Sequence, residues 1–418
     1  MASWNSTGID EDQVLVEERR FARILTLNRP KQLNAISFTM VSRLLELFSS
    51  YETDPSVKLV VVKGKGRAFC AGGDVSAAAH AIKESEWRKG AYFFRKQYTL
   101  NYLLATSSKP QVSLLNGIVM GGGAGVSIHG RFRVATEKSI FAMPETSLGH
   151  FPDVGASYYL PRLRGFFGEY VGLTGARLDG AEMLACGLAT HFVPSERLTQ
   201  LEEALCRADT SQPSIISAII DKFSRTPILH EQSAYNRLDV IDKCFSRRTV
   251  EDILAALEEE ALKKKDNWID STIRDLKKAS PTSLKISLRS IREGRLQDAG
   301  QCLIREYRMA CHVMRGEVSE DFIENQTLGD VPTRRMSHEG GWTQGSVPAS
   351  TLSPEGGWIG CRALLLDKDR NPKWEPSKLE LVTDAMVERY FSRIEDEEWE
   401  DLKLTARPNL PASATSKL

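Results

Sequence analysis

Two glycine-rich turns, each directly after an apolar run, constrain the fold of this chain more than any other feature. The run at 58–63 (KLVVVK) leads into glycines at 66–73, and the run at 112–115 (VSLL) leads into glycines at 117–123. A helical pattern follows each turn. Glycine lets the backbone come close to a ligand, and the first amides of a helix are unpaired. Two such turns could supply two backbone N–H groups to a single oxygen, as an oxyanion hole requires.

Two carboxylates follow the second turn. A short strand ends near Glu145, which stands between apolar neighbours, and Asp153 comes after Pro152. A carboxylate in a partly apolar setting is a plausible base or nucleophile. In the alternative interpretation the glycines only permit close packing, Glu145 is a surface residue and Asp153 is the N-cap of a helix. The residues by themselves leave both interpretations open, because short motifs also arise by chance.

Three long motifs stand out in this part of the chain. They are FCAGGD at 69–74, NGIVMGGG at 116–123 and MPETSLGHFPDVGASYYLPRL at 143–163. Together they resemble the crotonase (enoyl-CoA hydratase/isomerase) superfamily. The PET and FPDVG elements of the third motif resemble the 3-hydroxyisobutyryl-CoA hydrolase branch. The resemblance covers residues 14–332 and resumes at 360–391. It implies an α/β fold with a crotonase-like ββα spiral core and a helical C-terminal region.

The resemblance also implies a role for each matching residue. The backbone amides of Gly73 and Gly122 would hold the thioester oxygen of an acyl-CoA, and Glu145 would attack the thioester carbonyl or activate water. Asp153 would lie beside the hydroxyl of the substrate and assist proton transfer. Gln97 stands where the branch commonly has a glutamate at the polar end of the substrate, and an amide can hydrogen-bond there but cannot act as a base. The implied reaction is hydrolysis of 3-hydroxyisobutyryl-CoA in valine breakdown, with no cofactor beyond the CoA of the substrate.

Several residues keep other functions open. Superfamily hydratases carry a second glutamate where this chain has Gly125, so a hydratase or isomerase is disfavoured. Gln97 in place of glutamate, and His150 in place of an aliphatic residue, leave room for a paralogue that binds acyl-CoA or a partner without turnover. His150 either titrates near neutral pH or is a satisfied structural histidine. Ser127 and His129 lack the G-x-S-x-G pattern and are expected to be packing residues.

Composition limits the partners. The 418 residues include 55 Lys plus Arg and 55 Asp plus Glu, so bulk charge gives no reason to expect binding to nucleic acid or a membrane surface. No apolar run reaches the roughly 18 residues of a membrane span. The seven cysteines show no C-x-x-C spacing, which predicts reduced thiols and no metal site. Members of the superfamily often form homo-oligomers, and the resemblance allows one here.

The C-terminal residues predict a location. Ser416-Lys417-Leu418 is the address that the peroxisomal import receptor reads, and the N-terminal residues lack the arginine-rich amphipathic pattern of a mitochondrial presequence. We therefore expect the peroxisome, with the mitochondrion or the cytoplasm as the alternative.

The pattern along the chain predicts six segments and several helix starts. Ser37, Ser214, Thr249 and Ser280 each precede an apolar-periodic run and are predicted N-caps. Pro281 suits the first turn of a helix, where its missing N–H costs nothing. The predicted segments are a flexible N-terminus at 1–12, the ββα core with the active site at 13–215, a helical region at 216–328, a flexible insertion at 329–360, a strand and helix segment at 361–405, and a tail with the peroxisomal signal at 406–418.

Overall fold

The computed structural model describes residues 12–74, 87–316, 318–319, 321–324, 372–396 and 398–407. The N-terminus before residue 12, the predicted insertion at 329–360, residues 361–371 of the predicted strand and helix segment, and the tail from residue 408 onward lie outside the described residues. The boundaries of the predicted segments therefore stay predictions.

Within the described ranges, the larger of two sheets has six strands. In spatial order they are β1 (Val14–Arg19), β2 (Ala22–Leu27), β3 (Leu59–Gly64), β5 (Gln111–Leu115), β7 (Phe132–Ala135) and β10 (His191–Phe192). Strands β1 and β2 form an antiparallel hairpin, and the remaining pairs are parallel. Side chains alternate across the sheet. Leu59 and Val61 pack with helices α8 (Leu198–Cys206) and α9 (Pro213–Asp221), whereas Val60 and Val62 join the main core on the other face.

The smaller sheet positions the site. Its strands are β4 (Ala68–Cys70), β6 (Ile118–Met120), β8 (Ile140–Ala142) and β9 (Leu178–Asp179), in that order. Strands β4, β6 and β8 are parallel, and β9 is antiparallel to β8. Neighbouring parallel strands direct their carboxyl ends to the same edge of a sheet, so the chain leaves all three at one place. The mixture of these sheets with helices confirms the predicted α/β class.

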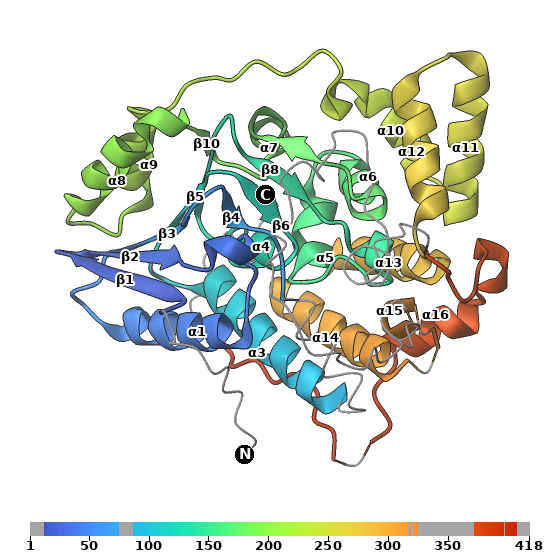
Figure 1. Cartoon of the computed structure of the whole chain (residues 1–418), viewed down its shortest axis with the longest axis horizontal. Coiled ribbons are helices and arrows are strands. Elements are labelled where there is room, and N and C mark those ends of the chain that lie inside the picture. The colour runs from blue at the N-terminus through green and yellow to red at the C-terminus, as the bar shows by residue number, and fades with distance from the viewer. Residues whose placement is uncertain are drawn as a thin grey trace, which may run out of the picture.

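Helices surround both sheets. Figure 1 shows α14 beside α3 in the lower half of the molecule, and α10, α11 and α12 grouped at its edge, away from the six-stranded sheet. Helix α1 also packs against α3. The bounds are α1 (Phe38–Thr53), α3 (Trp87–Thr106), α4 (Gly122–Gly125), α5 (Ala156–Tyr159), α6 (Phe167–Thr174), α7 (Gly180–Cys186), α10 (Leu238–Phe245), α11 (Val250–Lys263), α12 (Asn267–Lys278), α13 (Pro281–Gly294), α14 (Ala299–Arg315), α15 (Asp321–Glu324) and α16 (Asp384–Phe391). Within the described ranges, no helix has the length and apolar character needed to cross a membrane.

Three of the four predicted helix caps are confirmed. The hydroxyl of Ser37 accepts from the amide of Met40, and Thr249 forms a reciprocal capping box with its helix. Ser280 caps α13, which begins at Pro281. The prediction for Ser214 is wrong because α9 already begins at Pro213, whose fixed φ and missing N–H favour the first position of a helix.

Replacing Thr249 by Ala should lower the free energy of unfolding by about 1 kcal/mol, since the first turn of α11 loses a hydrogen-bond acceptor. The matched control is Ser214→Ala, which removes a hydroxyl that caps nothing and should leave stability unchanged. Urea denaturation of the two variants beside the parent protein measures both effects. Equal losses in the two variants would contradict the assignment of the caps.

Candidate active site

A cavity of about 110 Å³ opens where β4, β6 and β8 end. Both glycine turns and the segment that carries Glu145 follow directly from these strands, so all three border the cavity. Its wall is made largely of glycines, apolar side chains and a few polar groups. The lining residues are Ala71, Gly72, Gly73, Asp74, Phe93, Phe94, Gln97, Met120, Gly121, Gly122, Pro144, Glu145, Leu148, His150, Asp153 and Phe322.

The first glycine turn is held in an extended conformation by a parallel bridge to Ile36. The amide of Ile36 donates to the carbonyl of Gly72 at 2.8 Å, and the amide of Asp74 donates to the carbonyl of Ile36 at 2.9 Å. The Arg29 guanidinium forms an ion pair with the Asp74 carboxylate at 2.9 Å. In an extended chain successive amides point to opposite sides. The amide of Gly73 therefore points away from Ile36, and no acceptor in the described part of the chain bonds to it.

The second glycine turn brings another free amide to the same place. Gly121 has φ of +43°, a conformation that favours glycine, and Gly122 then begins α4. Helix α4 starts there, so the Gly122 amide has no partner one turn back. A Cβ on Gly122 would lie 3.1 Å from the amide nitrogen of Gly73. The structure thus places the two predicted oxyanion-hole residues side by side, and a side chain at 122 would fill the space in front of them.

The Glu145 carboxylate reaches into the same space. Glu145 begins a 3-10 turn, η2 (Glu145–Leu148), after β8, and its side chain is buried. A Cβ on Gly121 would lie 2.8 Å from Oε1 of Glu145, and Oε2 has no hydrogen-bond partner among the described residues. Burial, together with the nearby charge of Asp153, raises the pKa of Glu145 well above its ordinary value. This residue is not at the surface, which excludes the alternative interpretation for it.

Asp153 also faces the cavity and is fixed by a tyrosine. The hydroxyl of Tyr98 on α3 donates to Oδ2 of Asp153 at 2.7 Å. Burial raises the pKa of Asp153 to about 7, and the Glu306 carboxylate contributes to that rise. The alternative interpretation as a helix cap is wrong: α5 begins at Ala156 with Gly155 as its N-cap, and the Asp153 side chain is used by Tyr98 instead.

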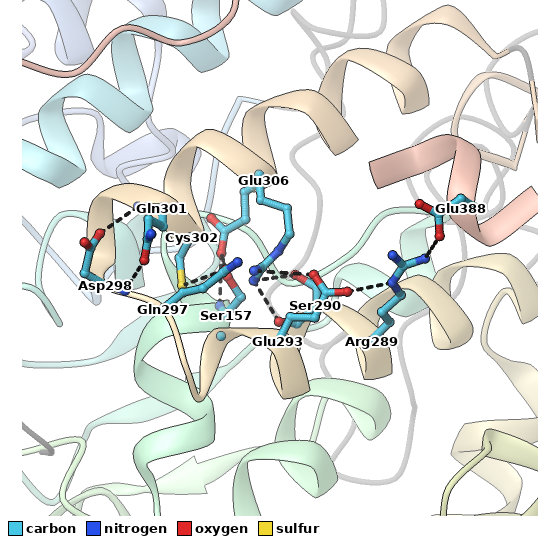
Figure 2. Close-up of polar contacts among 12 residues, drawn as sticks. Ser157, Arg289, Ser290, Glu293, Gln297, Asp298, Gln301, Cys302, Glu306 and Glu388 are labelled. Atoms are coloured by element: carbon cyan, nitrogen blue, oxygen red, sulfur yellow. Dashed lines mark hydrogen bonds and ion pairs between the residues drawn. The ribbon is translucent and has the colours of Figure 1, made fainter. Parts of the chain in front are cut away.

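A sharp turn directs Asp153 into the cavity. Val154 has φ of +53° and Gly155 has φ of +83°, and a β-branched residue with positive φ costs on the order of 1–3 kcal/mol. Hydrogen bonds on both sides hold this turn. His129 Nε2 donates to the Val154 carbonyl at 2.8 Å, and the Gly155 amide donates to the Glu306 carboxylate at 2.7 Å. Figure 2 shows Glu306 on α14 pointing at Ser157, whose amide and hydroxyl both donate to it at 3.0 and 2.6 Å.

The other polar residues singled out in the sequence divide into two groups. Gln97 and His150 line the cavity, and a Cβ on Gly122 would lie 3.1 Å from Nε2 of Gln97. Burial lowers the pKa of His150 to about 3, so this histidine is neutral and does not titrate near pH 7. Ser127 and His129 point elsewhere and pack as predicted. The Ser127 hydroxyl donates to the carbonyl of Gly123 within its own turn at 2.7 Å.

No side chain fits at position 125, where superfamily hydratases carry a second catalytic glutamate. A Cβ on Gly125 would lie 2.7 Å from Cβ of Val154 and 2.9 Å from Nδ2 of Asn101, whose amide donates to the Gly125 carbonyl at 2.9 Å. Real Cβ atoms do not approach other heavy atoms this closely. Gly125 therefore lacks a side chain because the turn at Val154 occupies the space.

Sequence reasoning missed three residues that shape the site. Tyr98, Glu306 and Phe322 come from α3, α14 and α15, and only the fold brings them to the cavity or to the turn beside it. Of the three, only Tyr98 has a sequence signal, and a weak one: it directly follows the predicted substrate-binding residue Gln97. Within the described ranges, no group of His, Cys, Asp or Glu side chains could hold a metal ion.

Comparisons with known proteins agree with the family that the sequence motifs resemble. The profile of the family described as enoyl-CoA hydratase/isomerase matches residues 22–327 and 350–391. The chain is 63% identical to the Arabidopsis thaliana protein named 3-hydroxyisobutyryl-CoA hydrolase 1, over 98% of each chain. It is 40% identical to the Arabidopsis thaliana small ribosomal subunit protein mS47, over 96% of this chain and 90% of that one. The crystal structure of a carnitinyl-CoA dehydratase from Mycobacterium thermoresistibile matches with a TM-score of 0.78 at 32% identity, over 95% of this chain and 100% of that chain.

Replacing Asp153 by Asn should stabilise the protein at pH 8, by an amount on the order of a few kcal/mol in the free energy of unfolding. The raised pKa means that the folded chain holds the proton more tightly than the unfolded chain does, so ionisation weakens the fold as pH rises from about 4 to about 7. The difference in the free energy of unfolding between the variant and the parent protein should be smaller at pH 5. Thermal unfolding at the two pH values tests this, with the exposed Asp209→Asn as the control. A variant less stable than the parent at pH 8 would contradict it.

Proposed function

This chain belongs to the enoyl-CoA hydratase/isomerase family, and we propose that it hydrolyses 3-hydroxyisobutyryl-CoA to 3-hydroxyisobutyrate and CoA. The observation that carries the proposal is the meeting of two unpaired backbone amides, at Gly73 and Gly122, with the buried carboxylate of Glu145. The high identity to a relative named for this reaction supports the choice of substrate. The resemblance predicted from the motifs is thereby confirmed at the level of the family.

The geometry suits cleavage of a thioester. A carbonyl oxygen placed between the Gly73 and Gly122 amides gains two hydrogen bonds as it becomes negative, and one such donor is typically worth on the order of 3 kcal/mol in the transition state. Ionised Glu145 either takes a proton from the water that attacks the carbonyl carbon, or attacks that carbon itself and forms an acyl anhydride that water hydrolyses after the thiolate has left. Its raised pKa makes it a stronger base than an exposed carboxylate. The C–S bond then breaks, and Asp153, whose pKa of about 7 lets it hold a proton, can protonate the departing thiolate.

A hydratase or isomerase is a weaker candidate. The reason to consider it is that one similar solved structure is named as a dehydratase. Adding water to a double bond needs an acid and a base on the reacting carbons, and the contacts around Gly125 exclude a side chain there. Crotonyl-CoA incubated with the protein should therefore keep its enoyl absorbance.

A chain that binds without turnover is the remaining candidate. One relative carries the name of a ribosomal protein, so family membership alone does not decide between catalysis and assembly. Glu145 and Asp153 favour catalysis here, because two buried carboxylates with raised pKa values weaken the fold and are hard to explain as structural groups. Tight binding of short-chain acyl-CoA thioesters without release of CoA would favour the binding role.

Replacing Glu145 by Gln should reduce the release of CoA from 3-hydroxyisobutyryl-CoA by about 10²–10⁴-fold, because an amide of the same shape is neither base nor nucleophile. A thiol reagent that reports free CoA measures the rate. The matched control is Glu196→Gln on the surface, which should keep full activity. Unchanged turnover in the Glu145 variant would remove this residue from the mechanism.

A location in the peroxisome is a separate proposal, supported by Ser416-Lys417-Leu418. A fluorescent protein joined to the N-terminus of the full chain should collect in peroxisomes. Deleting Leu418 from the same fusion should leave it in the cytoplasm. Mitochondrial fluorescence, or peroxisomal fluorescence that survives the deletion, would count against the proposal.

A further inference from the structure

His150 is a polar residue on an aromatic part of the cavity wall. Its ring centroid lies 4.5 Å from that of Phe151, 5.3 Å from that of Phe322 and 5.8 Å from that of Phe94, all in edge-on arrangements. Two of these rings, Phe94 and Phe322, line the same cavity. An aliphatic or aromatic side chain would fill this place without any polar atom to satisfy. The histidine therefore calls for an explanation other than packing.

Neither ring nitrogen of His150 is satisfied by a residue that the structure describes. The residue is only 6% exposed, and both Nδ1 and Nε2 lack a hydrogen-bond partner among the described residues. A neutral imidazole carries one N–H donor and one acceptor nitrogen. Leaving such groups buried and unpaired destabilises a protein, so nearly all of them find a partner. His129 is the contrast within this chain, since its Nε2 is used by the Val154 carbonyl.

Gln97 is a second buried polar residue at the same cavity. The residue is 2% exposed and its Nε2 lies against the Gly122 turn. Two buried polar side chains, one amide and one imidazole, thus present donors and acceptors to a space enclosed by phenylalanines. Both are neutral, and the nearby carboxyl groups of Glu145, Asp153 and Glu306, whose pKa values are all raised by burial, would disfavour an added anion. A neutral group that both donates and accepts fits this environment better than an anion.

We propose that His150 is a specificity-determining residue that hydrogen-bonds a hydroxyl group on the acyl chain of the substrate. The inference rests on the proposed function for the class of ligand, an acyl-CoA thioester, but not on turnover. A bound hydroxyl gives the imidazole a hydrogen-bond partner that no described residue supplies. An acyl chain without the hydroxyl leaves the imidazole unpaired in the complex, and sites built in this way discriminate strongly against such analogues.

Binding in the Glu145→Gln background tests the inference without hydrolysis. Titration calorimetry compares 3-hydroxyisobutyryl-CoA with isobutyryl-CoA, which differ by one hydroxyl. The preference for the hydroxylated ligand should fall about tenfold when His150→Leu is added, through weaker binding of the hydroxylated ligand alone. His150→Asn, which keeps a donor and an acceptor, should retain part of the preference. The exposed His230→Leu is the matched control and should change neither affinity.

Two further outcomes separate this role from a structural one. His150→Leu should raise the melting temperature of the ligand-free protein, because it removes two unpaired buried nitrogens. A preference that stays unchanged in His150→Leu, or an equal loss of affinity for both ligands with a lower melting temperature, would overturn the inference. Activity of the parent protein is measured separately. Hydroxyl-selective binding without CoA release would sustain the role of His150 while refuting the proposed hydrolysis.

Discussion

The parallel register of β4, β6 and β8 is the constraint on which the site depends. Residues 73, 122 and 145 are far apart in sequence, and each follows one of these strands. Because adjacent parallel strands end at the same edge, the backbone itself brings the two free amides and the carboxylate together. Glycines at 121 and 122 complete the arrangement, since a Cβ at either position would meet Glu145 or Gly73. The chemistry thus rests on main-chain geometry more than on flexible side chains.

Two of the three buried acids, Asp153 and Glu306, are stabilised by specific hydrogen-bond donors. Tyr98 donates to Asp153, and backbone amides of the following turn donate to Glu306. Ion pairs also join the neighbouring helix α13 to the C-terminal segment. Figure 2 shows Arg289 of α13 paired with Glu293 on the same helix and with Glu388 on α16. The C-terminal helical region therefore supports the turn that presents Asp153, and α15 adds Phe322 to the cavity wall.

Sequence patterns predicted the parts of this structure that depend on local chemistry. The glycine turns, the apolar strands and the caps at Ser37, Thr249 and Ser280 follow from backbone and capping preferences that neighbouring residues determine. The prediction of a cap at Ser214 is wrong because a proline one position earlier starts the helix. The local sequence around Asp153 also fits a helix cap, and only the fold shows that its carboxylate accepts from Tyr98 instead. Glu306 and Phe322 have no local signal, since their roles arise from long-range packing. That no described residue bonds to the His150 imidazole likewise depends on its three-dimensional surroundings.

The contact between Gly125 and Val154 has a consequence for how this family diversifies. A carboxylate at position 125 needs the volume that Val154 now fills, and Val154 is held in place by the hydrogen bond from His129 and by the turn that aims Asp153. A single substitution at 125 would therefore clash before it could contribute any new acid. An evolutionary route from this active site to one with a second glutamate on α4 must therefore change positions 125 and 154 together. The effect of a substitution at either position depends on the residue at the other.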